Sequence, residues 1–303
     1  DLADERLLAA SSDHCVELAR ACERAARAQR AVTDVEQVVY QDAWLEVTLA
    51  NSASFAGAFT ASSAWMYCTA FAGEVGERMS GFGLDIARAP QGLDPERTGR
   101  EAGERAALLA GATKPSSRRC AVVFDAFAAA ALVAAVGEML SAEQVERGRS
   151  PFADKLGAEV ASSSLTIADD ATLPDGPASA PFDGEGSPTG RTELIAGGRL
   201  LTFVHDVRTA RRAGTNTTAN ALRSSYRTPP VVGVSNLVVA GEQVPFAQLL
   251  ATLGDGFYIT DLSGLHSGVN PVSGTFSVGA AGVVVRGGEL AELEDPHGGG
   301  EVG

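Results

Sequence analysis

The chain of 303 residues is poor in cysteine and histidine, the side chains that supply the nitrogen and sulfur ligands of zinc. Its four cysteines include no C-x-x-C pair, so a zinc ribbon or a redox dithiol is not expected, and reduced thiols are typical of a cytoplasmic protein. No two of its four histidines are four residues apart, the spacing that places two imidazoles on one face of a helix. These eight residues are Cys15, Cys22, Cys68, Cys120, His14, His205, His266 and His297.

Positive charge and long apolar runs are also scarce. The chain has 24 lysines and arginines against 38 aspartates and glutamates, a formal charge of -14, which argues against nucleic acid or an anionic membrane as a partner. The longest apolar run, residues 126–136, is well short of the roughly 18 to 20 residues that cross a bilayer. We therefore expect no membrane span, and the first residues show no secretory signal.

The length suggests two domains, at about 150 residues each, and a polar linker at residues 114–119 predicts domains at 1–115 and 116–303. In the first domain we expect an amphipathic helix within 1–31 and then a meandering antiparallel sheet. A turn at Gln41–Asp42 would make a hairpin of strands 35–40 and 45–49, and Asn51–Ser52 is a second turn. Further strands are expected at 57–62, 67–72 and 77–84, and a helix at 95–109 is capped by Asp94.

The second domain reads as mostly β. A short strand at 121–124 precedes an Ala-rich helix at 126–147. Strands are then expected at 164–168, 191–195, 198–204 and 282–286, with short helices near 208–213 and 245–253, and residues 298–303 are flexible by composition. The predicted fold class is α+β, with an N-terminal helix-plus-antiparallel-sheet domain and a mostly-β C-terminal domain.

Residues 148–191 hold a dense series of turns, acidic residues and arginines. Asp169, Asp170, Asp183 and Glu185 are the strongest carboxylate candidates, and they either cap turns, contact a peptide or partner, or act as acid and base. Nearby arginines either pair with these carboxylates or bind the carboxylate of a substrate, namely Arg147, Arg149, Arg191, Arg211 and Arg212.

Other catalytic patterns are weak. Asp206 follows His205, but on an alternating strand the two side chains would point to opposite faces. There is no G-x-S-x-G motif of a serine hydrolase and no glycine-rich loop followed by Lys-Ser/Thr of a nucleotide-binding protein.

Several segments in one fixed order resemble the TldD/PmbA family of zinc metallopeptidases. They are RGRSPFADKLG, SLTIADDATLP and PFDGEGSPTGRTELI, followed by segments at 210–214, 220–223, 229–237, 255–260 and 269–277. The resemblance covers roughly residues 95–290 continuously and extends more loosely back to about residue 35. TldD-type members carry HExxxH on the Ala-rich helix and a later cysteine ligand, and such motifs supply metal ligands and a carboxylate base together.

Counting back from the matching turn at Arg147 places the HExxxH slots on Val133, Ala134 and Glu138. Neither histidine is present, and no cysteine follows Cys120. This pattern resembles the PmbA/TldE branch, which lacks the metal motif and pairs with a TldD-type subunit. The resemblance therefore implies no cofactor in this chain and zinc in the partner.

We accordingly expect a non-catalytic, cytoplasmic subunit of a heterodimeric peptidase that processes or degrades unfolded or modified peptides. Its partners would be a TldD-like subunit and a peptide, with exposed strand edges available for main-chain pairing. Candidate contacts are Asp183, Glu185, Arg191 and Asn270. The alternatives are a stand-alone peptide-binding scaffold, or a metal-independent hydrolase that uses the Asp/Glu/Arg cluster.

Overall fold

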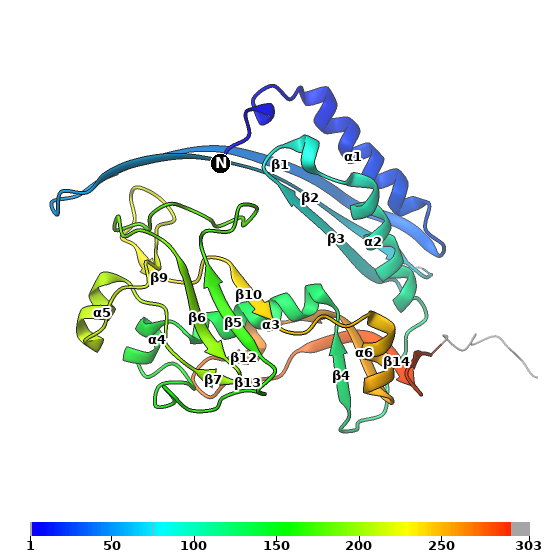
Figure 1. Ribbon diagram of the computed structural model, residues 1–303. Coiled ribbons are helices and arrows are strands. Elements are labelled where there is room, and N and C mark those ends of the chain that lie inside the picture. The colour runs from blue at the N-terminus through cyan, green and yellow to red at the C-terminus, as the bar shows by residue number, and fades with distance from the viewer. Residues whose placement is uncertain (1, 75, 292–303) are drawn as a thin grey trace, which may run out of the picture.

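The structure, a computed structural model, describes residues 2–74 and 76–291 and confirms a mixed α+β fold. Figure 1 shows two lobes, an N-terminal lobe (residues 2–110) on one three-stranded sheet and a C-terminal lobe (residues 121–291) with several smaller sheets. His297 and residues 298–303 lie outside the described residues. Within those residues, no helix is both long and apolar enough to span a bilayer.

The N-terminal sheet is an antiparallel meander, as expected, and consists of β1 (Val32–Ala50), β2 (Ala56–Ala72) and β3 (Met79–Ala87). The separate strands predicted at 57–62 and 67–72 are wrong, because both lie within the single strand β2. The turn predicted at Gln41–Asp42 is wrong, because both residues lie inside β1, opposite Trp65 and Ala64 of β2. Neither residue interrupts the strand, because pairing with β2 continues without a break from Gln41 to Ala50. The chain reverses instead at residues 51–55, where the predicted Asn51–Ser52 turn is confirmed.

Two helices cover one face of this sheet and pack on it closely. They are α1 (Ser12–Arg27), after a short 3-10 turn η1 (Glu5–Leu7), and α2 (Pro95–Leu109), after η2 (Pro90–Gly92). Asp94 caps α2 as predicted, accepting from the Arg97 amide at 2.9 Å. The core between the helices and the sheet consists mostly of small side chains, including Cys22 of α1, Cys68 of β2 and the alanines of α2, so the backbones approach closely.

Two glycines of β3 make this close approach possible. A Cβ atom on Gly81 would lie 2.1 Å from the carbonyl oxygen of Ala102, and one on Gly83 would lie 2.0 Å from that of Thr98. Both carbonyls belong to the backbone of α2 and cannot rotate away. Glycine is therefore the residue that lets α2 rest directly on β3.

The β1–β2 hairpin extends past β3 as a two-stranded ribbon, seen in Figure 1 as the long arm over the C-terminal lobe. Its tip contacts that lobe. The ring of Phe55 lies 5.0 Å from the ring of Phe182, and the side-chain amide of Asn51 donates to the carbonyl oxygen of Glu185 at 2.9 Å. The ribbon thus joins the two lobes at a point far from the linker between them.

The C-terminal lobe contains two four-stranded sheets and two small hairpins. One sheet has the order β10-β5-β6-β7 and the other β15-β14-β11-β4, while β8 pairs with β9 and β12 with β13. The bounds are β4 (Ala121–Phe124), β5 (Thr166–Asp170), β6 (Arg191–Ala196), β7 (Arg199–Leu200), β8 (Ala221–Leu222), β9 (Val231–Val232), β10 (Leu237–Ala240), β11 (Gly256–Ser263), β12 (Val269–Asn270), β13 (Thr275–Phe276), β14 (Gly279–Arg286) and β15 (Glu289–Leu290).

Five helices are described in this lobe: α3 (Ala126–Met139), α4 (Ala142–Glu146), α5 (Val207–Ala213), α6 (Phe246–Leu253) and α7 (Leu265–Gly268). The single helix predicted at 126–147 is wrong, because the chain breaks between α3 and α4. There the Val204 amide donates to the Leu140 carbonyl and the Ala142 amide donates to the Val204 carbonyl, both at 3.0 Å. This pairing with a distant segment replaces helical hydrogen bonds.

Candidate functional site

A cavity of about 380 Å³ lies against α3, the helix that carries the three predicted HExxxH slots. Two of these slots, Val133 and Ala134, line the cavity. We call it the α3 cavity. Its lining is apolar except for one hydroxyl, and it consists of Ala126, Ala129, Ala130, Val133, Ala134, Val234, Ser235, Leu237 and Val239.

The residues present do not fit a catalytic zinc ion. Val133 and Ala134 offer no ligand atom, and Glu138 is a single exposed carboxylate further along α3. No group of three histidine, cysteine, aspartate or glutamate side chains comes together in residues 2–74 and 76–291. Zinc sites need three or four such ligands, so the residues at these positions cannot hold a catalytic zinc ion.

The start of α3 is fixed by a contact between the lobes. Asp125 caps the helix by accepting from the Phe127 amide at 2.8 Å, and its other oxygen accepts from the Tyr258 hydroxyl at 3.1 Å and from Arg105 of α2 at 3.5 Å. Burial, together with the Asp125 carboxylate, raises the pKa of Tyr258 to about 12. Tyr258 therefore stays protonated as a donor at neutral pH.

A buried polar group lies behind the α3 cavity, at the end of β5. Asp169 accepts from the Ser235 amide at 2.7 Å, the Ser235 hydroxyl at 3.0 Å and the Asn220 side-chain amide at 2.6 Å. Burial raises the pKa of Asp169, although these three hydrogen bonds oppose the shift. The carboxylate holds the segment after β9 in place and thereby positions Ser235 in the cavity wall.

The neighbouring carboxylate, Asp170, has a different environment. It accepts from the amide and the hydroxyl of Thr172, at 2.9 and 2.6 Å, and pairs with Arg191 at 3.3 Å. These hydrogen bonds, led by the Thr172 hydroxyl, lower the pKa of Asp170. Arg191 is thus paired with a carboxylate of its own chain, with its side chain 40% exposed.

Asp183 and Glu185 bind backbone amides in the turn before β6. Asp183 is buried and accepts from the amides of Glu185, Ser187 and Ala221 at 3.0, 2.9 and 3.2 Å. Glu185 accepts from the Val207 amide at 2.8 Å, at the start of α5. The hydrogen bonds of both residues hold the turn against β8 and α5.

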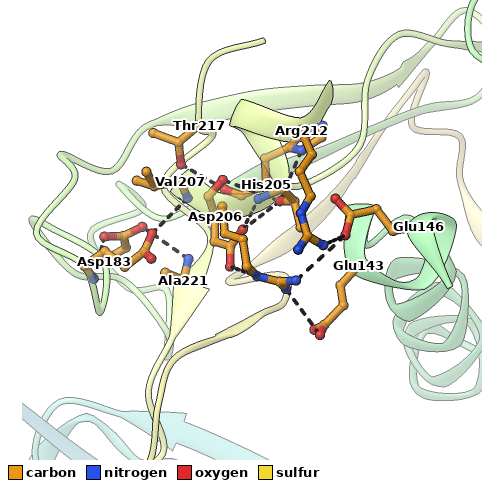
Figure 2. A network of polar contacts seen from close by, with 12 residues as sticks. Glu143, Glu146, Asp183, His205, Asp206, Val207, Arg212, Thr217 and Ala221 are labelled. Atoms are coloured by element: carbon orange, nitrogen blue, oxygen red, sulfur yellow. Dashed lines mark hydrogen bonds and ion pairs between the residues drawn. The ribbon is translucent and has the colours of Figure 1, made fainter. Parts of the chain in front are cut away.

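His205 and Asp206 lie beside this turn, as Figure 2 shows, directly before α5 and not on a strand. Asp206 caps α5, accepting from the Thr209 amide at 2.6 Å, and His205 Nδ1 lies 3.3 Å from the Thr209 hydroxyl. Both side chains are buried. Burial lowers the pKa of His205, although the Asp206 and Glu146 carboxylates oppose the shift.

Ion pairs on the surface join α5 to α4. Arg212 lies 3.0 Å from Glu146 (Figure 2), and Arg208 lies 3.3 Å from Glu143. Arg147 also pairs with Glu143, at 2.7 Å. Of the arginines expected to pair with the acidic clusters of residues 169–185, Arg191 does so, whereas Arg147 and Arg212 pair with glutamates of α4.

The structure brings only part of the predicted set together. Asp183 and Glu185 share one turn, whereas Asn270 lies in the β12–β13 hairpin and accepts from the amides of Val272 and Ser273. Sequence reasoning did not single out Asn220 or Ser235. Both lie in segments that carried the family resemblance, 220–223 and 229–237, and that was the available signal.

Two family models match the chain in succession. Residues 5–110 match the PmbA/TldA metallopeptidase central domain, and residues 117–295 match the C-terminal domain of the same family. Metalloprotease PmbA of Escherichia coli O157:H7 is 28% identical over 282 residues, which is 92% of this chain and 60% of that protein. A metalloprotease of Archaeoglobus fulgidus is 34% identical over 61% of this chain and 43% of its own length.

Solved structures are similar over nearly the whole chain. A putative modulator of a DNA gyrase from Thermotoga maritima has a TM-score of 0.90 at 30% identity, covering 96% of this chain and 66% of that one. TldE from Thermococcus kodakarensis has a TM-score of 0.85 at 25% identity, covering 95% and 65%. The chain therefore spans about two thirds or less of the length of these relatives.

Proposed function

This chain belongs to the TldD/PmbA metallopeptidase family, and from that premise we propose that it is the TldE/PmbA-like, non-catalytic subunit of a heterodimeric peptidase. In this proposal a TldD-like partner supplies zinc, the catalytic glutamate and water. The pair processes or degrades unfolded or modified peptides in the cytoplasm. This chain closes and shapes the chamber in which the peptide reaches the partner's metal.

One observation carries the proposal: the helix surface matched to HExxxH holds Val133 and Ala134 in the wall of an apolar cavity. A metal centre cannot be assembled there from one carboxylate, Glu138. The remaining task for a peptidase fold of this kind is to bind a partner or a peptide. Two related subunits of one fold can form a quasi-two-fold interface, as homodimers do.

The rival hydrolase is less well supported. A general acid or base needs a carboxylate free to reach a substrate. Asp169 and Asp183 are buried and bind amides of their own chain, and Asp170 binds Thr172 and Arg191. These contacts favour structural roles for all three carboxylates.

Coexpression tests the proposal. This chain and a TldD-like protein with an intact HExxxH should copurify one to one, with an interface of at least about 1,000 Å². The complex should cleave peptides, and neither chain alone should be fully active. Replacing the glutamate of the partner's HExxxH with glutamine should abolish cleavage without dissociating the complex.

A partner that is fully active by itself, while this chain stays monomeric beside it, would refute the subunit role. That result would favour the stand-alone scaffold. Peptide cleavage by this chain alone, in the presence of a chelator, would instead support the metal-independent hydrolase.

A further inference from the structure

The α3 cavity adjoins a strand whose other edge is open. β10 is the terminal strand of its sheet, and within the described ranges it pairs with β5 alone. Two of its side chains, Leu237 and Val239, line the cavity, and Val239 is 52% exposed. An edge strand presents unpaired N–H and C=O groups in a row, which is a template for an added strand.

The size and lining of the cavity indicate what such a strand would carry. A dry cavity of about 150 Å³ holds a benzene ring, so the α3 cavity has room for about two large apolar side chains. Ala130 and Ala134 line the cavity and are exposed to solvent, so side chains can reach it from outside. Alternate residues of a strand point to one face, so an extended peptide delivers two such side chains at once.

The charges around the cavity indicate which peptide residues would flank the apolar side chains. No lysine or arginine lines the cavity, and Glu138 is exposed one helical turn beyond Ala134, on the same side of α3. The chain as a whole carries a formal charge of -14. A lysine or arginine beside the apolar residues would therefore be attracted, and an acidic residue repelled.

We propose that the α3 cavity and the free edge of β10 bind an extended peptide, which adds to β10 as a strand, inserts alternate apolar side chains into the cavity and places a basic residue near Glu138. The biological role of this binding rests on the proposed function: this subunit would hold one part of the substrate while the partner cleaves another. Binding itself needs neither the partner nor a metal.

The test uses the full chain alone and a fluorescein-labelled peptide of alternating leucine and threonine flanked by lysines, with binding followed by anisotropy. Ala130→Trp should weaken binding at least ten-fold because the indole fills the cavity. Ala247→Trp is the matched control, since Ala247 is exposed on α6 and does not line the cavity, and it should bind as the wild type does.

Two kinds of altered peptide test the strand and the charge. Two peptides are methylated on alternate backbone nitrogens, one in the odd register and one in the even register, so that each lacks the N–H donors along one of its edges. The register that removes the donors facing β10 should weaken binding at least ten-fold, although the side chains are unchanged. Exchanging the flanking lysines for glutamates should weaken binding several-fold, and Glu138→Gln should reduce that difference. Each comparison uses a folded protein, confirmed by its circular dichroism.

Either of two results would overturn the proposal: unchanged binding by Ala130→Trp, or unchanged binding of both methylated registers. If Ala130→Trp blocks copurification with the TldD-like partner but not peptide binding, the cavity belongs to the subunit interface and the proposal fails. Peptide binding without any copurification would refute the subunit role alone, so the two failures are distinguishable.

Discussion

Phe55, at the tip of the β1–β2 ribbon, packs edge-on against Phe182 of the C-terminal lobe, with ring centroids 5.0 Å apart and an interplanar angle of 69°. Phe59 makes a second edge contact with the same ring at 5.2 Å. Phe182 directly precedes Asp183, so the ribbon tip packs against the turn whose amides Asp183 binds. The aromatic contact and the polar turn form one continuous structure.

Phe55→Ala should therefore destabilise the protein by about 1–2 kcal/mol, because an aromatic pair and half-buried apolar area are lost. Urea unfolding measures the change, and hydrogen exchange should quicken at residues 51–56 and 182–187. Tyr226→Ala is the control: that ring is 82% exposed and should matter by less than about 0.5 kcal/mol. Equal effects of the two substitutions would contradict a packed tip.

Asp183→Ala should cost about 2–3 kcal/mol, since it leaves three amide donors without their acceptor. Glu185→Ala removes one acceptor and should cost about 1 kcal/mol. Thermal melting and copurification with the partner measure both, with the exposed Asp175→Ala as control. A variant that keeps its stability and association but abolishes cleavage by the complex would place its residue in the active site.

Stability should fall as the pH drops below about 6.5, the ordinary pKa of histidine. Burial lowers the pKa of His205 in the folded state, so between the two values the unfolded state binds the additional proton. Urea unfolding from pH 7.5 to 5.0 should show a shallower loss for His205→Gln than for the wild type. His14→Gln, at an exposed position, should keep the wild-type slope.

The isolated chain should bind no stoichiometric zinc, because Val133, Ala134 and Glu138 offer at most one ligand. Metal analysis after dialysis measures this. The double variant Ala134→His, Glu138→His, which places two imidazoles four residues apart on one face of α3, should bind zinc more tightly than the wild type, yet more weakly than a complete site of three or four ligands. About one tightly held zinc per wild-type chain would redirect attention to His205, His266 and the acidic clusters.

Gly83→Ala should cost at least about 3 kcal/mol, because the new Cβ would lie 2.0 Å from the Thr98 carbonyl oxygen and the backbone must move. Gly190→Ala is the matched control, since a Cβ there meets no atom within 4 Å, and it should change stability by less than about 0.5 kcal/mol. Chemical denaturation of both variants measures the difference. A tolerated Gly83→Ala would contradict direct contact between α2 and β3.

Local signals in the sequence predicted some elements well. The helix after Asp94 begins and ends where its cap, its proline and Gly111 indicate, and the short strand at 121–124 is present. The turn at Gln41–Asp42 failed because a long ribbon keeps pairing through polar residues, and nothing nearby in the sequence reports the partner strand. The break after Met139 failed for the same reason, since it depends on Val204, more than sixty residues away.

In the candidate site, too, local features were predictable from the sequence and long-range contacts were not. Carboxylates among turn residues were recognisable as caps, and Asp183 binds amides of its turn. The cavity beside α3 was not predictable, because it depends on where β10 lies relative to the helix. Asp169, Asn220 and Ser235 come into contact only after three segments have folded together, so no spacing in the sequence predicts their hydrogen bonds.

The close contact of Gly81 and Gly83 with α2 also limits how the N-terminal lobe can move. Sliding of packed helices by small steps is one common form of conformational change, and it needs side chains that can yield. Here the backbone of β3 packs directly on the backbone of α2, so the two elements are expected to move together as one rigid body. Displacement between the lobes would then bend the linker at residues 111–120 and separate contacts that cross between the lobes, at the ribbon tip and between Arg105 and Asp125.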